Sequence, residues 1–232
     1  VGVVDGMGIV TALSRHLGRL RPEYRCTLVD EGQDLGTLEL TVLRKLTKEG
    51  PNDLFLCGDA AQRIYTKHAD LTHAGINTSG RSATLKQNYR NSRQILTAAH
   101  AVLTRSLEGI PRGAINVEVL PPEYASFSSP KPLLIHASSV DEEIAYGLGY
   151  LQSLAESTGL TQRYCLALCG YTQSAVEKLG AQLGMPALSA RTNLREAQIF
   201  ISDLEQTKGF EFDAVVLVNC TSAVMPHPQL PE

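Results

Sequence analysis

The sequence predicts an α/β protein built on parallel sheets that helices cover on both faces. Two observations predict this class. Short apolar runs alternate with segments of helical periodicity along nearly the whole chain, and most of these runs are continuously apolar, as in strands buried on both faces. The 232 residues, 43% of them hydrophobic, suffice for one large domain or two small ones.

The strands are expected at the short apolar runs. In chain order these are residues 26–29, 54–57, 83–85, 133–136, 165–169, 199–201 and 214–218. Residues 109–132 hold five prolines and are expected to form a loop or a short extended connection.

Helices are expected where apolar residues recur every three or four positions. The predicted inner faces are Val10, Leu13, Leu17 and Leu20; Leu38, Val42 and Leu46; Ile95, Ala99 and Val102; Ile144, Leu148, Leu151 and Ala155; and Val176, Leu179 and Leu183. The predicted helix ends are Asn91 or Ser92 before the third helix, a capping box of Ser139 and Glu142 before the fourth, and Thr172 and Gly184 around the fifth.

Composition and charge restrict the class of protein. The net charge is −3, but residues 1–112 carry 15 basic and 11 acidic side chains, whereas residues 113–232 carry 6 and 13. The mildly basic first part permits a polyanionic partner. No apolar run approaches the roughly 18 residues of a membrane span, so we expect a cytoplasmic protein without a membrane segment.

The five cysteines are scattered and do not have zinc-ligand spacing. Most of them lie in or at the end of apolar runs, which predicts that they are small buried side chains.

Acidic side chains follow two of the predicted strands. Asp30 and Glu31 come directly after the run 26–29, and Gly58, Asp59 and Gln62 come after the run 54–57. Ligands of parallel α/β sheets bind at the carboxyl ends of the strands. One carboxylate can hold a hydrated Mg²⁺ ion while its neighbour takes a proton from water; alternatively, the acids simply favour a helix N-terminus.

Two segments offer cations that could bind phosphate. Arg90 lies just after the predicted strand at 83–85, where a guanidinium group can grip phosphate oxygens, and Lys208 with Gly209 precedes the last predicted strand. Taken singly, Arg90 is better explained by a surface ion pair and Lys208 by a solvated lysine in a loop.

Four segments together resemble a known family. Residues 28–35 (LVDEGQDL), 54–65 (LFLCGDAAQRIY), 85–95 (LKQNYRNSRQI) and 207–217 (TKGFEFDAVVL) resemble motifs II, III, IV and V of the UvrD/Rep-like superfamily 1 helicases, in the family's order. The resemblance implies P-loop NTPase (RecA-like) motor domains that use ATP and Mg²⁺ to move on single-stranded DNA and unwind duplex DNA.

The resemblance also implies roles for individual residues. Asp30 would hold the Mg²⁺ of Mg-ATP, and Glu31 would polarise the attacking water. Gln62 would sense the γ-phosphate, which Arg90 would reach from the second motor. The remaining nucleotide-binding positions implied by the motifs are Gln33, Gly58, Asp59, Lys208, Gly209 and Glu211, with Glu211 on the ribose. Tyr65 would lie near single-stranded DNA, although a buried ring with a satisfied hydroxyl explains it equally well.

Two family motifs are absent from the sequence. The phosphate-binding GxxxxGK[ST] loop of motif I does not occur, and neither does motif VI after motif V. We therefore expect a helicase fragment: residues 1–84 as the C-terminal half of the first motor domain and residues 85–232 as most of the second. Hydrolysis by this piece alone is expected to fail without the N-terminal and C-terminal parts of the same protein.

Two other functions remain open. One is a non-catalytic, helicase-derived module that binds nucleic acid or protein, which the missing motifs would explain. The other is a small phosphohydrolase using Asp30 and Asp59, for which the sequence offers neither a nucleophile nor a phosphate loop.

Overall fold

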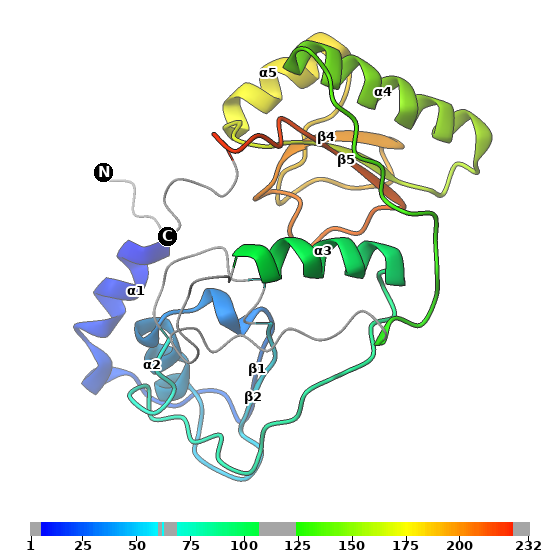
Figure 1. Ribbon diagram of the computed structural model, residues 1–232. Coiled ribbons are helices and arrows are strands. Elements are labelled where there is room, and N and C mark those ends of the chain that lie inside the picture. The colour runs from blue at the N-terminus through cyan, green and yellow to red at the C-terminus, as the bar shows by residue number, and fades with distance from the viewer. Residues whose placement is uncertain (1–5, 60–61, 63–68, 107–123, 225–232) are drawn as a thin grey trace. The chain divides into compact units, whose positions relative to one another are not determined.

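A computed structural model describes residues 6–59, 62, 69–106 and 124–224. The chain divides into two compact units, residues 1–133 and 134–232 (Figure 1). This boundary differs from the one between residues 84 and 85 that the sequence predicts for the two motor domains, which stays a prediction. The difference arises because the segment around the third long helix makes its hydrogen bonds to residues before 133: Asn88 forms an isolated bridge with Ala125, and the Ser92 and Ser129 hydroxyls share a hydrogen bond of 2.6 Å.

The first unit contains a two-stranded parallel sheet and its helices. Its elements are α1 (Gly6–Ser14), η1 (Leu17–Arg19), β1 (Thr27–Val29), η2 (Gly32–Asp34), α2 (Thr37–Leu46), β2 (Leu54–Leu56) and α3 (Arg93–Ser106). Strand β1 pairs with β2 in the register Thr27 to Leu54 and Val29 to Leu56. The strands at 26–29 and 54–57 and the helix at 38–46 are therefore confirmed, whereas the first predicted helix breaks after Ser14 into a short 3-10 turn.

One face of this sheet packs against α2 and the segment 69–76, and side chains on the other face are exposed to solvent. Leu40 of α2 forms a core with Ala74 and Ile76, against which the strand residues Leu54 and Leu56 pack. Side chains alternate across a strand, so Leu28 and Phe55, which are partners in the register, lie on the opposite face. They are 76% and 58% exposed.

Two expectations about residues 83–106 are wrong. Residues 83–85 form no strand, because no neighbouring segment among the described residues pairs with them. Helix α3 does begin after Ser92, whose hydroxyl accepts a hydrogen bond from the amide of Ile95 at 3.3 Å. Its predicted inner face at 95, 99 and 102 is exposed, and the adjacent stripe with Leu96 and Leu103 is half-buried instead.

The second unit is a three-stranded parallel sheet with two helices. Its elements are α4 (Val140–Ser157), β3 (Tyr164–Leu168), α5 (Gln173–Leu183), β4 (Ile199–Asp203) and β5 (Ala214–Val218). The strand order is β4-β3-β5, and every pair is parallel. All five residues of the central strand β3 are buried, which explains why its sequence is continuously apolar.

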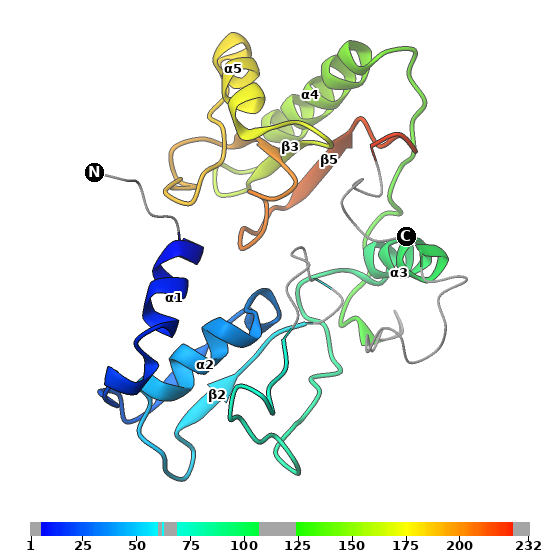
Figure 2. The ribbon, with the colours of Figure 1, turned by 90° about the vertical axis from the view of Figure 1, so that its left-hand side faces the viewer.

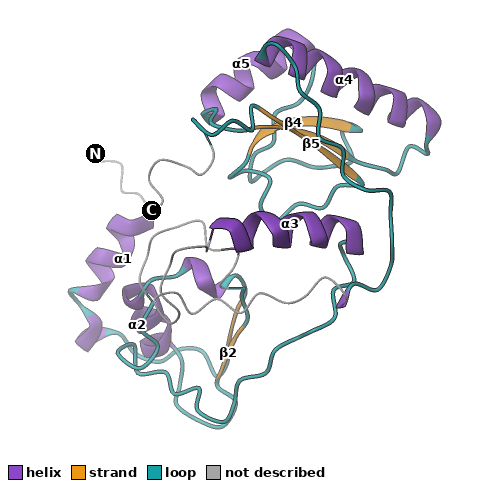
Figure 3. Cartoon of the chain, viewed as in Figure 1, coloured by secondary structure: helices purple, strands orange, loops and turns teal. Residues whose placement is uncertain are grey.

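Helices cover only one face of this sheet in the described residues. Helices α4 and α5 lie on the same side of the strands in Figure 2. Ile144 and Leu151 of α4 and Val176 of α5 pack on Leu166 and Ile201. The other face is covered by loops, which appear in teal in Figure 3. The side chains packed on that face are Leu188, Leu194, Ala197, Leu204, Phe210 and Phe212, against Cys165, Ala167 and Phe200. The expectation of helices on both faces therefore does not hold for residues 134–224.

The predicted helix caps of this unit are confirmed. The Ser139 hydroxyl accepts a hydrogen bond from the Glu142 amide at 3.2 Å, and Thr172 accepts one from the Ala175 amide. The Glu142 carboxylate bonds the amide and hydroxyl of Ser138 rather than Ser139, so the box is shifted by one residue on that side. Gly184 ends α5 with φ 67°, a conformation that favours glycine.

The predicted strand at 133–136 is also wrong. These residues form neither a strand nor a helix, and Leu133 and Leu134 are 76% and 84% exposed. The segment lies at the boundary of the two units, where it gains no ladder partner. In the part of the chain that the structure describes, no helix has the length and apolarity to cross a membrane.

Candidate nucleotide site at the ends of β1 and β2

The parallel pairing of β1 and β2 brings the two acidic segments of the first unit together. The Cys57 amide donates to the Val29 carbonyl at 2.9 Å, and the Gly32 amide donates to the Cys57 carbonyl at 2.8 Å. These two bonds continue the ladder past the last strand residues. The site predicted at the carboxyl edge of this sheet is therefore a single cluster in space.

Asp30 and Glu31 occupy a sharp turn at the end of β1. Glu31 has φ 52° and ψ 39°, a left-handed conformation that costs a non-glycine residue about 1–2 kcal/mol. The Asp30 carboxylate stabilises the turn by accepting the Glu31 amide at 2.9 Å. Asp30 is exposed and Glu31 half-buried, so the turn separates the environments of two adjacent carboxylates.

Gln33 connects the two strand ends. Its side-chain nitrogen donates to the Glu31 carboxylate at 2.5 Å, and its side-chain oxygen accepts the Asp59 amide at 3.0 Å. The residue is only 8% exposed. Both functional atoms of the amide are thus bonded inside the cluster, where they fix the Glu31 side chain relative to the end of β2.

Gly58 leaves the space that Gln33 occupies. A Cβ atom at position 58 would lie 2.3 Å from the Gln33 side-chain oxygen and 3.1 Å from the amide nitrogens of Gln33 and Gly32. No side chain fits there without moving the cluster. This close approach explains why a glycine lies just after the second strand.

Cys57 belongs to the cluster as well, which the sequence did not indicate. Its thiol donates to the Asp30 carboxylate at 3.2 Å and to the Val29 carbonyl at 3.4 Å. The hydrogen bond to Asp30 raises the pKa of Cys57, with smaller contributions from desolvation and from the charges of Asp30 and Glu31. Cys57 is exposed, as are Cys26 and Cys220, so the expectation of mostly buried cysteines is wrong. Its position directly after β2, at the edge where Asp30 follows β1, could have indicated that Cys57 lies in the cluster.

Gln62 joins the same cluster through Asp59. Its side-chain nitrogen donates to the Asp59 carboxylate at 2.9 Å, and its backbone amide donates to the Asp59 carbonyl at 3.0 Å. Tyr65, predicted to lie near DNA, is outside the described residues. Arg90 is exposed. It lies in a turn in which the Asn88 side-chain oxygen accepts hydrogen bonds from the backbone amides of Arg90 and Asn91.

The other predicted residues lie in the second unit, in the loop before β5. Gly209 has φ 85°, and the turn is closed by a bond from the Phe210 amide to the Thr207 carbonyl at 3.2 Å. Phe210 and Phe212 anchor the loop by packing on the sheet. Glu211 lies between them and is exposed, and Lys208 is half-buried.

The donor set suits a magnesium ion held largely by phosphate and water. Mg²⁺ in phosphoryl-transfer sites binds one or two carboxylates and keeps several waters, and Asp30 offers an exposed carboxylate. Among the described residues, no group of three or more histidine, cysteine or acidic side chains could enclose a metal without a ligand.

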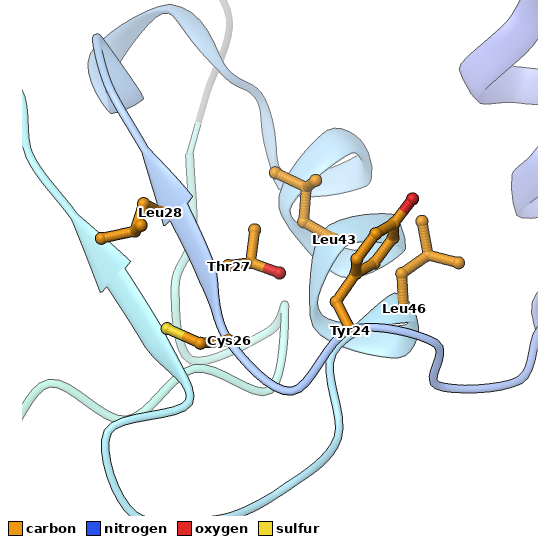
Figure 4. A pocket seen from close by; sticks show the side chains of 6 residues that line it. All are labelled: Tyr24, Cys26, Thr27, Leu28, Leu43 and Leu46. Atoms are coloured by element: carbon orange, nitrogen blue, oxygen red, sulfur yellow. The ribbon is translucent and has the colours of Figure 1, made fainter.

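A separate pocket lies at the opposite end of β1 (Figure 4). It has a volume of about 240 Å³ and is lined by Tyr24, Cys26, Thr27, Leu28, Leu43 and Leu46. This lining has no acidic or basic side chain, so the pocket is not part of the acidic cluster.

Part of the chain, including the acidic cluster, is similar to known proteins. Residues 7–73, which include β1, β2 and the acidic cluster, match the sequence model of the UvrD/REP helicase N-terminal domain. The chain is 31% identical to ATP-dependent DNA helicase UvrD1 of Mycobacterium leprae over 44% of this chain and 15% of that protein. It is 31% identical to ATP-dependent DNA helicase PcrA of Leuconostoc citreum over 41% of this chain and 13% of that protein.

A third relative covers more of the chain. Human TPR and ankyrin repeat-containing protein 1 is 26% identical over 94% of this chain, which corresponds to 8% of that protein. The chain thus spans less than a fifth of each of these three relatives. These matches show that residues 7–73 resemble the N-terminal domain of UvrD/REP helicases and that part of the chain is similar to proteins named ATP-dependent DNA helicases.

Proposed function

We propose that this chain is part of an ATP-dependent DNA helicase or translocase, in which hydrolysis of Mg-ATP drives movement on single-stranded DNA and unwinding of duplex DNA. The single observation that carries the proposal is the cluster at the carboxyl ends of β1 and β2, in which Asp30 and Glu31 stand beside the turn of Asp59 and Gln62. The match of residues 7–73 to the helicase N-terminal domain supports it.

Within this function the two carboxylates divide the work. The exposed Asp30 would hold Mg²⁺, which neutralises charge on the nucleotide phosphates when it is bound. Glu31 would orient water and accept its proton. The bond from Gln33 keeps the Glu31 carboxylate in place, which makes Gln33 a positioning residue in our proposal rather than a direct nucleotide ligand.

Gln62 and Arg90 are proposed to contact the γ-phosphate. The bond from Gln62 to the Asp59 carboxylate holds the Gln62 side chain at the strand-end cluster before nucleotide arrives. Arg90 contributes a guanidinium group on an exposed turn. Glu211 is proposed to accept hydrogen bonds from the ribose, since the anchors Phe210 and Phe212 leave it exposed, with Lys208 and Gly209 shaping the loop.

The decisive experiment replaces the proposed base in the complete protein that contains this chain. Glu31→Gln keeps the size of the side chain and its ability to bond Gln33, but it removes the basic carboxylate. DNA-stimulated ATP hydrolysis should be lost while nucleotide binding persists. The matched control is Glu49→Gln, at an exposed position outside the cluster, which should hydrolyse ATP normally. Undiminished turnover by Glu31→Gln would overturn the proposal.

A non-catalytic module derived from a helicase is the second candidate. The observation in its favour is that the relative aligned over 94% of the chain is named for TPR and ankyrin repeats, not for helicase activity. Under this alternative the complete protein would bind nucleic acid or protein without hydrolysing ATP, and Glu31→Gln would change neither property. ATP hydrolysis by the unmodified complete protein excludes it.

A further inference from the structure

Two thiols of the second unit meet at the carboxyl edge of its sheet. Strands β3 and β5 pair in the register Leu168 to Val218, so the residues that follow each strand leave the sheet side by side. The sulfur atoms of Cys169 and Cys220 are 3.4 Å apart. All five cysteines are among the described residues, and no other pair of them is in contact.

The backbone around this pair is held by specific bonds. Asn219 has φ 63°, a left-handed turn that brings Cys220 back toward β3. The Asn219 side chain donates to the Cys169 carbonyl at 2.9 Å, and its backbone amide donates to the Glu143 carboxylate at 2.6 Å. The short sulfur distance is therefore built into the turn after β5 and does not depend on a free chain end.

The two thiols differ in their access to solvent. Cys220 is exposed, whereas Cys169 is fully buried. Burial raises the pKa of Cys169 to about 12, with smaller contributions from the hydrogen bond and charge of Cys220 and from the charge of Glu143. An oxidant in solution therefore reacts with Cys220 first, while Cys169 lies in contact with it and is shielded from solvent.

We propose that Cys169 and Cys220 are a site of reversible oxidation that forms an intramolecular disulfide when the protein meets a peroxide. The peroxide oxidises the Cys220 thiol to a sulfenic acid and is reduced to water. The Cys169 sulfur then attacks the Cys220 sulfur, the S–O bond breaks, and a second water leaves with the Cys169 proton. A dithiol reductant restores both thiols.

The bridge would join segments that are 51 positions apart in the sequence. Such a link restricts the unfolded chain and ties the turn after β5 to the end of β3, so it should raise the thermal stability of this unit. The inference does not depend on nucleotide binding, because it rests only on contacts within residues 143–220.

The test uses the chain of residues 1–232 carrying Cys165→Ala, treated with hydrogen peroxide, blocked with a thiol reagent and digested with trypsin without reduction. Cys165 is replaced because it shares the tryptic peptide 164–178 with Cys169. We expect the linked peptides 164–178 and 209–232, the loss of two thiols, a mass lower by two hydrogen atoms, and full recovery with dithiothreitol.

Two variants test the assignment against the other exposed thiols. Cys220→Ser should abolish the linked peptide and the rise in melting temperature, and its reduced form should melt as the parent does, since position 220 is exposed. The double variant Cys26→Ser with Cys57→Ser should keep the bridge. The proposal is overturned if oxidised Cys220 accumulates as sulfinic acid with Cys169 still free, or if the crosslinks instead join Cys26 or Cys57 between molecules.

Discussion

Gln33 donates a hydrogen bond from its side-chain amide to the carboxylate of Glu31, and the same amide accepts the backbone N–H of Asp59. One nearly buried side chain thus couples the turn after β1 to the turn after β2. Glu31 sits in a left-handed backbone conformation, and the bond from Gln33 holds its carboxylate at this turn. A glutamine at this place therefore fixes the Glu31 carboxylate relative to the backbone after β2.

Replacing Gln33 should separate positioning from binding. Gln33→Ala removes the bond to the Glu31 carboxylate and the acceptor of the Asp59 amide. In the complete protein, kcat for ATP hydrolysis should therefore fall about 10-fold or more, the usual effect of removing a residue that orients a group in a metal site. The KM for ATP should change much less. Steady-state kinetics check this, with the exposed Gln152→Ala as control. A large rise in KM with unchanged kcat would instead make Gln33 a nucleotide ligand.

Two glycines on the same helix should respond oppositely to alanine. A Cβ atom at Gly147 would lie 2.8 Å from Val216 Cγ1 and 3.0 Å from Leu166 Cδ1, so Gly147→Ala should destabilise by about 1–3 kcal/mol. Gly149 has open space around it, and Gly149→Ala should stabilise by up to about 1 kcal/mol through helix propensity. Urea denaturation measures both. Equal effects would mean that α4 does not pack on β3 and β5 as described.

The N-cap of α4 should contribute measurably to stability. Ser139→Ala removes the acceptor of the Glu142 amide and should cost about 1 kcal/mol. Ser153→Ala is the matched control, because Ser153 is exposed within the same helix and bonds only the Gly149 carbonyl. The same denaturation measurement applies, and loss of stability in both variants would argue against a specific cap.

The ion pair of Arg44 and Asp53 should make the first unit sensitive to acid. The Arg44 guanidinium lies 2.8 Å from the Asp53 carboxylate and holds the pKa of that carboxyl below its usual value, and the Gly50 amide adds to the effect. A lowered folded-state pKa gives stability that is present above the unfolded pKa of about 4 and is lost as the pH falls through the folded pKa.

Asp53→Asn should therefore lower stability at neutral pH and flatten its decrease below about pH 5. Denaturant midpoints measured between neutral and acidic pH test this. Arg44→Gln should flatten the same limb, and combining the two substitutions should add little to either one. Additive effects would show that the two side chains act independently.

Mg-ATP should not measurably raise the melting temperature of residues 1–232. The sequence contains no GxxxxGK[ST] loop, whose amides and lysine supply most phosphate contacts in P-loop nucleotide sites. The remaining contacts should therefore bind nucleotide too weakly to stabilise the fold. Thermal denaturation with and without millimolar Mg-ATP checks this, with Mg²⁺ alone as control. A rise of several degrees would mean that the strand-end cluster binds nucleotide unaided.

Apolar runs and helix-capping residues correctly predicted the elements whose formation depends on neighbouring residues in the sequence. The run 165–169 is continuously apolar because both faces of β3 are buried. Ser139, Thr172 and Gly184 indicated helix ends because each acts within one turn of its helix. The acids after residues 29 and 57 could be placed together because parallel strands share an edge.

Apolar patterns gave wrong predictions where the structure depends on a neighbouring strand or on packing against another element. Residues 133–136 are apolar enough for a strand, but a strand needs a ladder neighbour, and none is present in the described part of the chain. On α3 the sequence offers two adjacent apolar stripes, and only packing selects the one with Leu96 and Leu103.

The sequence alone thus determined the alternating α/β class, the acidic residues at the strand ends and their resemblance to UvrD/Rep-like helicase motifs, since these depend on composition and on order along the chain. Tertiary structure alone decided that Gln33 ties Glu31 to Asp59, that Gly58 makes room for it, and that Cys169 meets Cys220. Each of these contacts joins residues whose distance depends on strand register and on the turns that follow, and neither leaves a periodic signal in the sequence.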